Sequence, residues 1–316
     1  MEMHIFSVSV LIAIYNPQWD KLKATLNSVV RQKDISFQIV ICDDYSIEDY
    51  SEKLSSFMTE KGFTKYKYVR AVKNGGTVKN LINGLPYCEG DYIKVLGQGD
   101  LLFDSEVLKN MYRYAVNNGL QLTGGLFQCF REENGAPTLY TMNRMPQILN
   151  CSNSRDRFYW YVVCMDIVNA VTLLYKKDCL FEYLSMMDGR IKYCEDHASR
   201  LMLADDVKMD VYKAPVAYYE ISSGISTARK SEFKTQLSQD NVEFYNMLID
   251  RCADDKHLVR VFKNRIRVIE HYSKRNVLRC LFSDFGILRY WFHCKFFPIK
   301  TSTEWQNDFL QQCYSD

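Results

Sequence analysis

Cysteine is frequent in this 316-residue chain, but paired cysteine motifs are absent. None of the 11 cysteines forms a Cys-x-x-Cys pair, their number is odd, and several lie inside apolar stretches, among them Cys164, Cys179 and Cys280. This spacing argues against a structural zinc site and against a disulfide framework. We therefore expect buried, reduced thiols, as is typical of a cytosolic protein.

An excess of charge of either sign is also missing. The formal net charge is +2, from 40 Lys and Arg against 38 Asp and Glu, and no nucleic-acid-binding module is recognisable. A nucleic-acid partner is therefore not expected, and any anion site must come from the local placement of charge. With 47% hydrophobic residues, the chain can bury a large core, as one extended domain or as a domain with an appended helical lobe.

Long apolar runs without charge are lacking as well. Residues 5–15 are apolar, but they follow Glu2 rather than a basic segment and have no small-residue cleavage site, so we read them as the first strand. Residues 158–175 contain Asp166 and Asn169, and a carboxylate in the middle of a bilayer is costly. We expect a buried element of a folded protein there.

The first hundred residues alternate between strand and helix patterns. Helical spacing of apolar residues separates predicted strands at 8–15, 37–42, 67–72 and 92–96. This order is typical of an α/β fold with a mostly parallel, doubly wound sheet. Further along, the patterns predict a helix at 107–116, strands at 124–131 and 169–175, and an irregular segment at 138–154.

Polar side chains follow several of these strands. Asn16 comes after the first strand, Asp43 and Asp44 end the second, and Asp100 follows the fourth. In an open parallel sheet, ligands bind at the carboxyl ends of the strands, near the point where the strand order reverses. The sequence therefore predicts a ligand site in the N-terminal half of the chain.

The order of the motifs resembles that of the family 2 glycosyltransferases of the bacterial surface-polysaccharide type, over about residues 7 to 225. The motifs are Asn16, Asp43-Asp44, Asn74-Gly75-Gly76 with Lys79-Asn80, Glu89-Gly90-Asp91-Tyr92-Ile93 leading to Asp100, and Glu195-Asp196. The resemblance implies a Rossmann-like GT-A fold and an inverting, hexosyltransferase-type enzyme (EC 2.4). Such an enzyme moves a sugar from a nucleoside-diphosphate sugar, here a UDP-sugar, to a hydroxyl of a glycan or glycolipid in surface polysaccharide assembly.

The same resemblance implies how the chain is divided. A GT-A catalytic domain is expected at 1–228, with nucleotide-sugar binding at about 1–100 and the acceptor and catalytic part at about 101–228. The stretch from Tyr218 to Ser226 is similar to the loop that closes the family's catalytic domain. Helical apolar spacing with dense Lys and Arg predicts a C-terminal helical region at 229–316. Whether the protein forms a homo-oligomer is left open.

Carried over position by position, the resemblance places Ala13 and Tyr15 beside the nucleobase and gives Asp44 a hydrogen bond to a uracil-type base. The alternative for Asp44 is a loop aspartate that accepts from local amides, and Asp43 reads as structural. Lys79 matches a basic position near the nucleotide, or is a solvated helix lysine. The implied nucleotide-sugar site consists of Ala13, Tyr15, Asn16, Asp43, Asp44, Asn74, Lys79, Asn80, Gln98, Gly99 and Asp100.

The metal motif departs from the family pattern. An acidic D-x-D-D type stretch is typical at the end of the fourth strand, and this chain has Gly97-Gln98-Gly99-Asp100 instead. Asp100 alone is left as a metal ligand, and Mn²⁺ or Mg²⁺ can be held by one carboxylate when a diphosphate supplies further oxygens. The missing acids keep a second hypothesis open, a non-catalytic relative that uses the fold for binding or assembly. A sugar nucleotidyltransferase is a weaker alternative, because Asn16-Pro17-Gln18 is not a glycine-rich phosphate loop.

Glu195 and Asp196 match the family's catalytic acidic pair. Asp196 is expected to be the base that removes the acceptor proton, with Glu195 contacting the acceptor or the donor sugar, and the two roles are exchangeable. The ordinary alternative is that acids at the start of a helix cap its amides and complement its dipole. His197 is expected to be a helix residue rather than a second base.

Basic and aromatic residues alternate between Arg275 and Lys300. Such a surface suits the headgroup region of an anionic membrane, where a lipid-linked glycan acceptor would lie. The alternative is a core helix that packs on the catalytic domain or on a second subunit. The first interpretation predicts a cytoplasmic protein that is peripheral at the inner face of the cell membrane.

Overall fold

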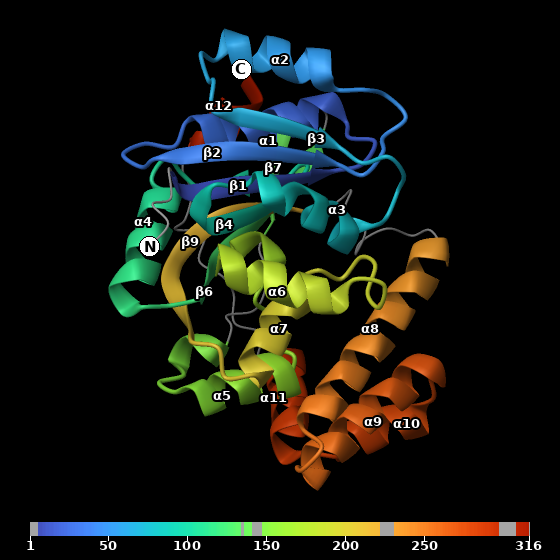
Figure 1. The fold of residues 1–316 in the computed structure, drawn as a ribbon. Coiled ribbons are helices and arrows are strands. Elements are labelled where there is room, and N and C mark those ends of the chain that lie inside the picture. The colour runs from blue at the N-terminus through green and yellow to red at the C-terminus, as the bar shows by residue number, and fades with distance from the viewer. Residues whose placement is uncertain (1–5, 134–135, 141–146, 222–230, 297–307, 316) are drawn as a thin grey trace.

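The computed structural model describes residues 6–133, 136–140, 147–221, 231–296 and 308–315. Its centre is a nine-stranded sheet in the order β3-β2-β1-β4-β8-β6-β9-β5, with β7 paired to β6 (Figure 1). The strands are β1 (Phe6–Ile14), β2 (Phe37–Asp43), β3 (Tyr66–Arg70), β4 (Gly90–Gly97), β5 (Leu101–Leu102), β6 (Leu122–Glu133), β7 (Ala136–Tyr140), β8 (Leu174–Lys176) and β9 (Met209–Glu220).

The first four strands form the parallel half of the sheet. β1 lies between β2 and β4 and is parallel to both, and β2 is parallel to β3. Ile14 pairs with Asp43 and Ala13 with Gly97, so the carboxyl ends of three strands lie side by side. The order reverses between β1 and β4, which is where ligands bind in such sheets. The predicted α/β fold with a mostly parallel sheet is confirmed.

Helices cover both faces of the sheet. Alternate residues of a strand point to opposite faces, and Val8, Val10 and Ile12 of β1 enter one core while Leu11 enters the other. The first core is covered by α1 (Trp19–Val30), α2 (Ser51–Glu60) and α4 (Val107–Asn118). The second is covered by α3 (Thr77–Gly84), α6 (Lys177–Met187) and α7 (His197–Ala204). The strands are therefore buried on both faces, which explains their nearly continuous apolar runs.

Two predictions about the middle of the chain are wrong. The strand expected at 169–175 is a 3₁₀ turn, Ala170–Thr172, followed by the three-residue strand β8. The carbonyl oxygens of Val171 and Leu173, which a continuous strand would use in its ladder, accept hydrogen bonds from Nζ of Lys94. Part of the segment expected to be irregular, Thr138–Tyr140, belongs to β7 and pairs with β6. The buried element at 158–175 begins with a π-helical turn, Tyr159–Val163, which follows α5 (Ser154–Phe158).

The long strand β9 was missed by the sequence analysis. It runs parallel to β6, with an irregular register around Leu126, and its last residues are Tyr218 to Glu220. The expectation of a loop at 218–226 is therefore wrong for residues 218–220. Residues 222–226 lie outside the described part of the chain.

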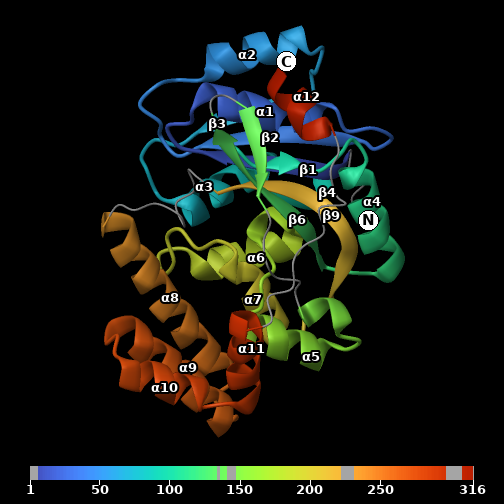
Figure 2. The ribbon, with the colours of Figure 1, turned by 180° about the vertical axis from the view of Figure 1, so that it is seen from behind.

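Beyond residue 230 the described chain is helical, as predicted. It forms α8 (Ser231–Arg251), α9 (Lys256–Glu270), α10 (Lys274–Leu281) and α11 (Phe285–Phe296) beside α6 and α7 (Figure 1). The last helix, α12 (Phe309–Ser315), lies instead against α1 at the other end of the molecule (Figure 2), where Nδ2 of Asn27 donates to the Cys313 carbonyl at 2.9 Å. The expected division at 228/229 remains a prediction. Among the helices that the structure describes, none is both long enough and apolar enough to cross a membrane.

Candidate functional site

Asp44 lies just beyond the end of β2 and holds the loop before α3. Its two carboxylate oxygens accept from the backbone N–H groups of Gly75 and Gly76, each at 2.7 Å, and its own N–H donates to the Ile14 carbonyl. Burial raises the pKa of Asp44, although these two amides oppose the shift. Asp44 therefore accepts from local amides, as the alternative interpretation predicted. Because each carboxylate oxygen can accept a second hydrogen bond, a nucleobase contact by Asp44 remains a prediction.

Asp43 is fully buried at the centre of a different network. Its Oδ1 accepts from the N–H and the hydroxyl of Ser46, and its Oδ2 accepts from the hydroxyl of Tyr68 at 2.7 Å. The guanidinium of Arg70 lies 3.8 Å from the same Oδ2. Asp43 thus shapes the loop after β2 by joining it to β3.

The other predicted donor-site residues surround these strand ends. Asn80 is buried, and its Nδ2 donates to the Cys42 carbonyl at 2.8 Å, so it ties α3 to β2. Asn16 has a φ of 45° and its Oδ1 accepts from the Ile47 N–H. Tyr15 is 46% exposed, with its N–H directed to Oε1 of Gln98 at 3.4 Å, so its ring is open to a ligand.

Of three further residues predicted for the donor site, two lie at or next to the ends of β1 and β2 and the third, Lys79, is paired with an exposed acid. Ala13 lies within β1, and Nδ2 of Asn74 donates to the Asp44 carbonyl oxygen at 3.3 Å. Lys79, in contrast, forms an ion pair of 2.6 Å with Asp188, and both side chains are more than a third exposed. Exposed pairs of this kind contribute little to stability, so Lys79 can exchange Asp188 for a ligand at small cost.

The turn after β4 presents Asp100. Gly99 has a φ of 93°, a conformation that favours glycine, and its N–H donates to Oγ1 of Thr25 at 2.9 Å. Oδ1 of Asp100 accepts from the N–H of Glu220, the last residue of β9, at 3.2 Å. Burial, with an added contribution from the Glu220 charge, raises the pKa of Asp100 to about 7.

Lys94 lies beneath this turn and was missed by the sequence analysis. Its side chain is fully buried in β4, and burial lowers its pKa to about 7 although the charge of Asp100 opposes the shift. A lysine inside the apolar strand Tyr92–Leu96 was the available signal, because such a residue is almost never fully buried without partners.

Among the residues that the structure describes, no group of three or more His, Cys, Asp or Glu side chains is placed to hold a metal ion. The assignment of Asp100 as a metal ligand at the end of β4 stays a prediction. A cation there would need oxygens from a bound diphosphate and from water, as Mg²⁺ commonly has.

Glu195 and Asp196 stand at the start of α7. The Asp196 side chain makes no capping hydrogen bond to the helix, so the capping explanation for this acid is wrong. Its Oδ2 lies instead 3.1 Å from Nη1 of Arg200. Burial opposes its ionisation, but His197, Arg200 and the hydrogen bond from Arg200 together outweigh burial and hold the pKa of Asp196 below its usual value.

The neighbouring carboxyl behaves in the opposite way. Burial raises the pKa of Glu195 to about 8, with further contributions from the charges of Asp196, Asp100 and Asp240. The charge of Asp100 therefore acts on Glu195, although the two residues are 95 positions apart in the sequence. His197 is buried and stacks on Phe244, with ring centroids 3.9 Å apart.

A short segment between the two acidic sites was also missed. The Lys192 carbonyl accepts from the N–H of Val78 in α3 at 3.1 Å, and the Lys192 charge lowers the pKa of Asp44 against the effect of burial. Lys192 is followed by Tyr193 and Cys194 and then by the acidic pair. The segment 192–194 thus connects the predicted donor end with the predicted catalytic end.

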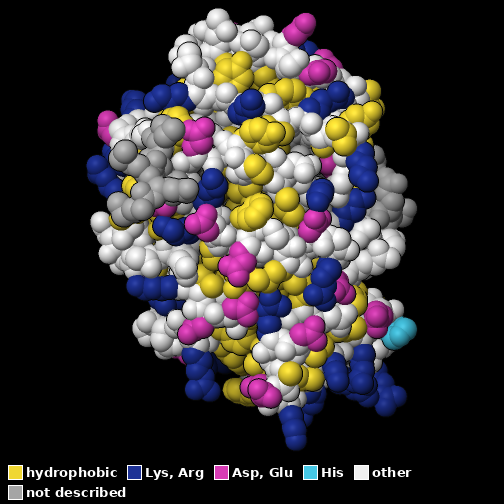
Figure 3. Space-filling view, viewed as in Figure 1, with side chains coloured by type: hydrophobic (Ala, Val, Ile, Leu, Met, Phe, Trp, Pro, Cys, Tyr) yellow, Lys and Arg dark blue, Asp and Glu magenta, His cyan; other side chains and the backbone are white. Residues whose placement is uncertain are grey.

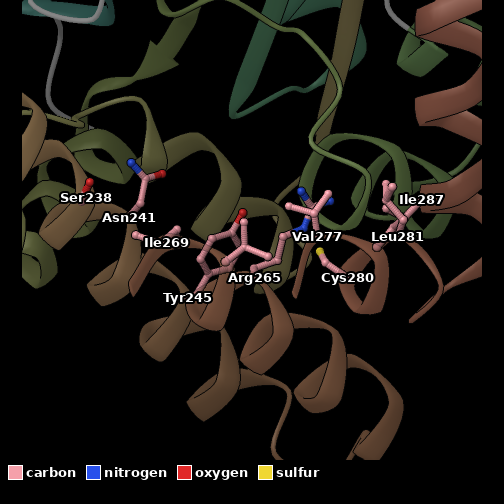
Figure 4. A pocket seen from close by; sticks show the side chains of 10 residues that line it. Ser238, Asn241, Tyr245, Arg265, Ile269, Val277, Cys280, Leu281 and Ile287 are labelled. Atoms are coloured by element: carbon pink, nitrogen blue, oxygen red, sulfur yellow. The ribbon is translucent and has the colours of Figure 1, made fainter. Parts of the chain in front are cut away.

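An apolar cavity of about 340 Å³ lies elsewhere, among the C-terminal helices. Side chains of α8, α9, α10 and α11 line it, among them Tyr245, Arg265, Cys280 and Ile287 (Figure 4). None of the residues predicted for the donor site or for catalysis lines this cavity.

Comparison with known proteins identifies the family of the chain. The family model for glycosyl transferase family 2 matches residues 9–180, which is more than half of the chain. A search of curated proteins finds no significant match.

Two solved structures illustrate the likeness in fold. S. aureus TarS 1–349 in complex with UDP-GlcNAc is 17% identical with a TM-score of 0.56, over 90% of this chain and 81% of that chain. Mannosyltransferase PcManGT from Pyrobaculum calidifontis in complex with GDP-Man and Mn²⁺ is 10% identical with a TM-score of 0.57, over 90% and 75% of the respective chains. With the matched family model, the mostly parallel sheet and the helical C-terminal region, the chain belongs to glycosyl transferase family 2 and has a GT-A fold.

Proposed function

We propose that this protein is an inverting glycosyltransferase that moves a sugar from a UDP-sugar to a hydroxyl group of a glycan or glycolipid. The observation that carries the proposal is the neighbouring pair Glu195 and Asp196 at the start of α7, whose pKa values are displaced in opposite directions, with the charge of Asp100 contributing to the raised pKa of Glu195. Carboxyls whose environments separate their pKa values in this way are typical of acid and base roles in one site.

The donor is assigned to the carboxyl ends of β1 and β2. The exposed ring of Tyr15 offers a face for a nucleobase, and Asp44 offers oxygens that can accept from the N–H of a uracil. Support for a nucleotide-sugar donor comes from TarS and PcManGT, which have this fold and are described in complex with UDP-GlcNAc and with GDP-Man. UDP is favoured over GDP by the position of Asp44.

Asp196 is assigned the role of base. Its lowered pKa keeps it ionised at neutral pH, so it can accept the proton of the acceptor hydroxyl as that oxygen bonds to the anomeric carbon. The bond from this carbon to the diphosphate oxygen breaks on the opposite face, and its electron pair leaves with the diphosphate. The raised pKa of Glu195 favours its protonated form at neutral pH, and in that form it donates a hydrogen bond to a sugar hydroxyl.

A divalent cation, Mn²⁺ or Mg²⁺, fits next to Asp100. Burial and the charge of Glu220 raise the pKa of the Asp100 carboxyl in the metal-free protein. A bound cation would lower this pKa and favour the ionised carboxylate. Asp100 would hold this ion, and the chemistry supplied there would be neutralisation of negative charge on the diphosphate. The absence of a second acid at position 97 or 99 favours one alternative, a non-catalytic relative that binds nucleotide without transfer.

The acceptor is assigned to a lipid-linked glycan at the inner face of the cell membrane, in surface polysaccharide assembly. Large apolar side chains protrude from the surface of α10 and α11, with exposed fractions of 70% for Phe282 and 78% for Phe285. The same two helices carry exposed basic side chains, among them Arg279 and Lys295, and Lys and Arg side chains project from the lower end of the molecule in Figure 3, where the helices α8 to α11 lie. Aromatic and basic side chains together are typical of surfaces that bind anionic lipid.

The membrane assignment is tested with vesicles. We expect the protein to sediment with vesicles that contain phosphatidylglycerol and much less with phosphatidylcholine alone. Replacing Phe282 and Phe285 together by Ser should reduce sedimentation and leave UDP binding intact. Equal sedimentation of the variant and the natural protein would show that this surface is not the contact.

The donor assignment is tested by calorimetry. We expect UDP to bind more tightly than GDP, with an affinity that increases when Mn²⁺ is added, and the increase to disappear in Asp100→Ala. Screening of UDP-sugars for transfer would follow. UDP binding without transfer to any acceptor would favour the non-catalytic relative, and a complete lack of nucleotide binding would overturn the proposal.

A further inference from the structure

We propose that Asp240, on the C-terminal helix α8, is a positioning residue that fixes the segment 192–194 and through it the acidic pair Glu195 and Asp196. This inference rests on the proposed function, because it gives the helical region a part in transfer. Asp240 lies outside the residues that match the family model, and no motif in the sequence points to it.

The geometry around Asp240 is unusual for a carboxylate on a helix. Its side chain is fully buried, and it accepts from three successive backbone N–H groups of the segment 192–194. Lys192 donates to Oδ1 at 3.0 Å, whereas Tyr193 and Cys194 donate to Oδ2 at 2.7 and 3.2 Å. Successive amides that converge on one anion form a backbone nest. Here the anion is the Asp240 side chain of α8, so the conformation of the segment depends on that helix.

The segment is also held from its other side. The Lys192 carbonyl accepts from the Val78 N–H, and a Cβ atom added to Gly76 would lie 2.4 Å from Cγ of Lys192. Gly76 in turn donates its own N–H to Asp44. The segment is thus clamped between the start of α3, at the predicted donor end, and Asp240.

The position of the acidic pair follows from this clamp. The N–H of Glu195 donates to the Tyr193 carbonyl, and the N–H of His197 to the Cys194 carbonyl, so the turn that begins α7 is built directly on the segment. A displacement of about 1 Å in a reacting group can reduce the rate by about 10²-fold. Loss of the Asp240 contacts would therefore affect turnover without removing any group that touches the reactants.

Asp240 also acts through its charge. Its neighbour on the helix, Asn241, points to the cavity among the C-terminal helices (Figure 4), whereas Asp240 faces the segment and contributes to the raised pKa of Glu195. Asp196 beside it and Asp100 from the end of β4 also raise the pKa of Glu195, and Tyr175 of β8 interacts with it. Removing the Asp240 charge should lower the pKa of Glu195.

The test compares three variants of the full chain. Asp240→Asn removes the charge and replaces one accepting oxygen by an amide group that cannot accept. Asp240→Glu keeps the charge but displaces it by one methylene. Asp250→Asn makes the same chemical change at an exposed position of the same helix and is the control. Circular dichroism and thermal unfolding show whether each variant is folded.

Hydrogen exchange gives the first readout and does not need a substrate. We expect the amides of residues 192–194 to exchange about tenfold faster in Asp240→Asn than in the natural protein, because they lose acceptors. Asp250→Asn should leave their exchange unchanged. Unchanged exchange in Asp240→Asn would overturn the inference, even if no transferase activity were found for the natural protein.

Turnover gives the second readout. Asp240→Asn should reduce kcat by about 10²-fold and leave the Kd of UDP nearly unchanged. Activity should fall at high pH as Glu195 loses its proton, and in this variant that fall, the high-pH limb of the profile, should move to lower pH. Asp240→Glu should reduce kcat but keep this limb where the natural protein has it. Faster exchange together with natural kcat and an unmoved limb would show that Asp240 only stabilises the fold.

Discussion

Arg200 holds Asp196 in place: Nη1 of its guanidinium lies 3.1 Å from Oδ2 of the carboxylate, one helical turn earlier in the chain. Arg200 is 8% exposed and also lies over the ring of Tyr161, with its Cζ 4.7 Å from the ring centroid. The contact keeps an acid ionised at the start of α7 where burial alone would favour its neutral form. It also replaces the helix cap that the sequence would suggest for an acid at this position.

Replacing Arg200 by Met should raise the pKa of Asp196 and destabilise the fold. The lowered pKa contributes stability above the pKa of the unfolded chain, and the part of this contribution that comes from the guanidinium is lost in the variant. We expect a loss of about 1–3 kcal/mol at pH 7 in urea unfolding. Arg251→Met, which breaks the more exposed pair with Asp205, is the control and should cost less. Equal costs would contradict the assigned importance of the Arg200 contact.

The two acids of the pair should respond differently to amide substitution. Asp196→Asn should reduce kcat by about 10²-fold or more, because the base is removed. The kcat/KM of the natural protein should fall above pH 8 as Glu195 loses its proton. Glu195→Gln keeps a hydrogen-bond donor, so it should retain transfer and lose this limb. An activity that instead rises through pH 8, with Glu195→Gln inactive, would exchange the two roles.

Asp100→Asn should stabilise the metal-free protein at high pH. The folded protein holds the Asp100 proton more tightly than the unfolded chain between about pH 4 and 7, so ionisation costs stability as the pH rises through this window. In urea unfolding with a chelator, the variant should gain on the order of 2 kcal/mol over the natural protein between pH 4.5 and 8. A difference that does not depend on pH would show that Asp100 titrates normally.

Gly76→Ala should be far more harmful than Gly62→Ala. Both glycines have positive φ, of 87° and 63°, but a Cβ at position 76 would lie 2.7 Å from the Lys192 carbonyl oxygen, whereas nothing lies within 4 Å of one at position 62. We expect a loss of about 1 kcal/mol for Gly62→Ala and about 3 kcal/mol for Gly76→Ala, with weaker UDP binding in the latter only. Similar losses by thermal unfolding would mean that the segment 192–194 can move aside.

Local patterns were sufficient for the parallel half of the fold. The apolar runs that end at Asn16, Asp43 and Asp100 correspond to β1, β2 and β4, and their bounds differ from the prediction by one or two residues. They were readable because strands buried on both faces carry continuous apolar runs, and because helices between them repeat apolar residues at their own period. The strand β9 and the 3₁₀ turn before β8 were not readable, since their conformations depend on pairing with β6 and on the amine of Lys94.

The sequence by itself determined the α/β architecture, the edge of the sheet that carries polar side chains, and the presence of an acidic pair at the start of a helix. Tertiary structure alone decided that Asp196 is paired with Arg200 instead of capping its helix, that Asp100 and Glu195 interact, and that Asp240 binds the amides of residues 192–194. The reason is physical. Periodicity records only which face of an element is buried, whereas a carboxylate takes its pKa and its partners from whatever the folded chain places beside it.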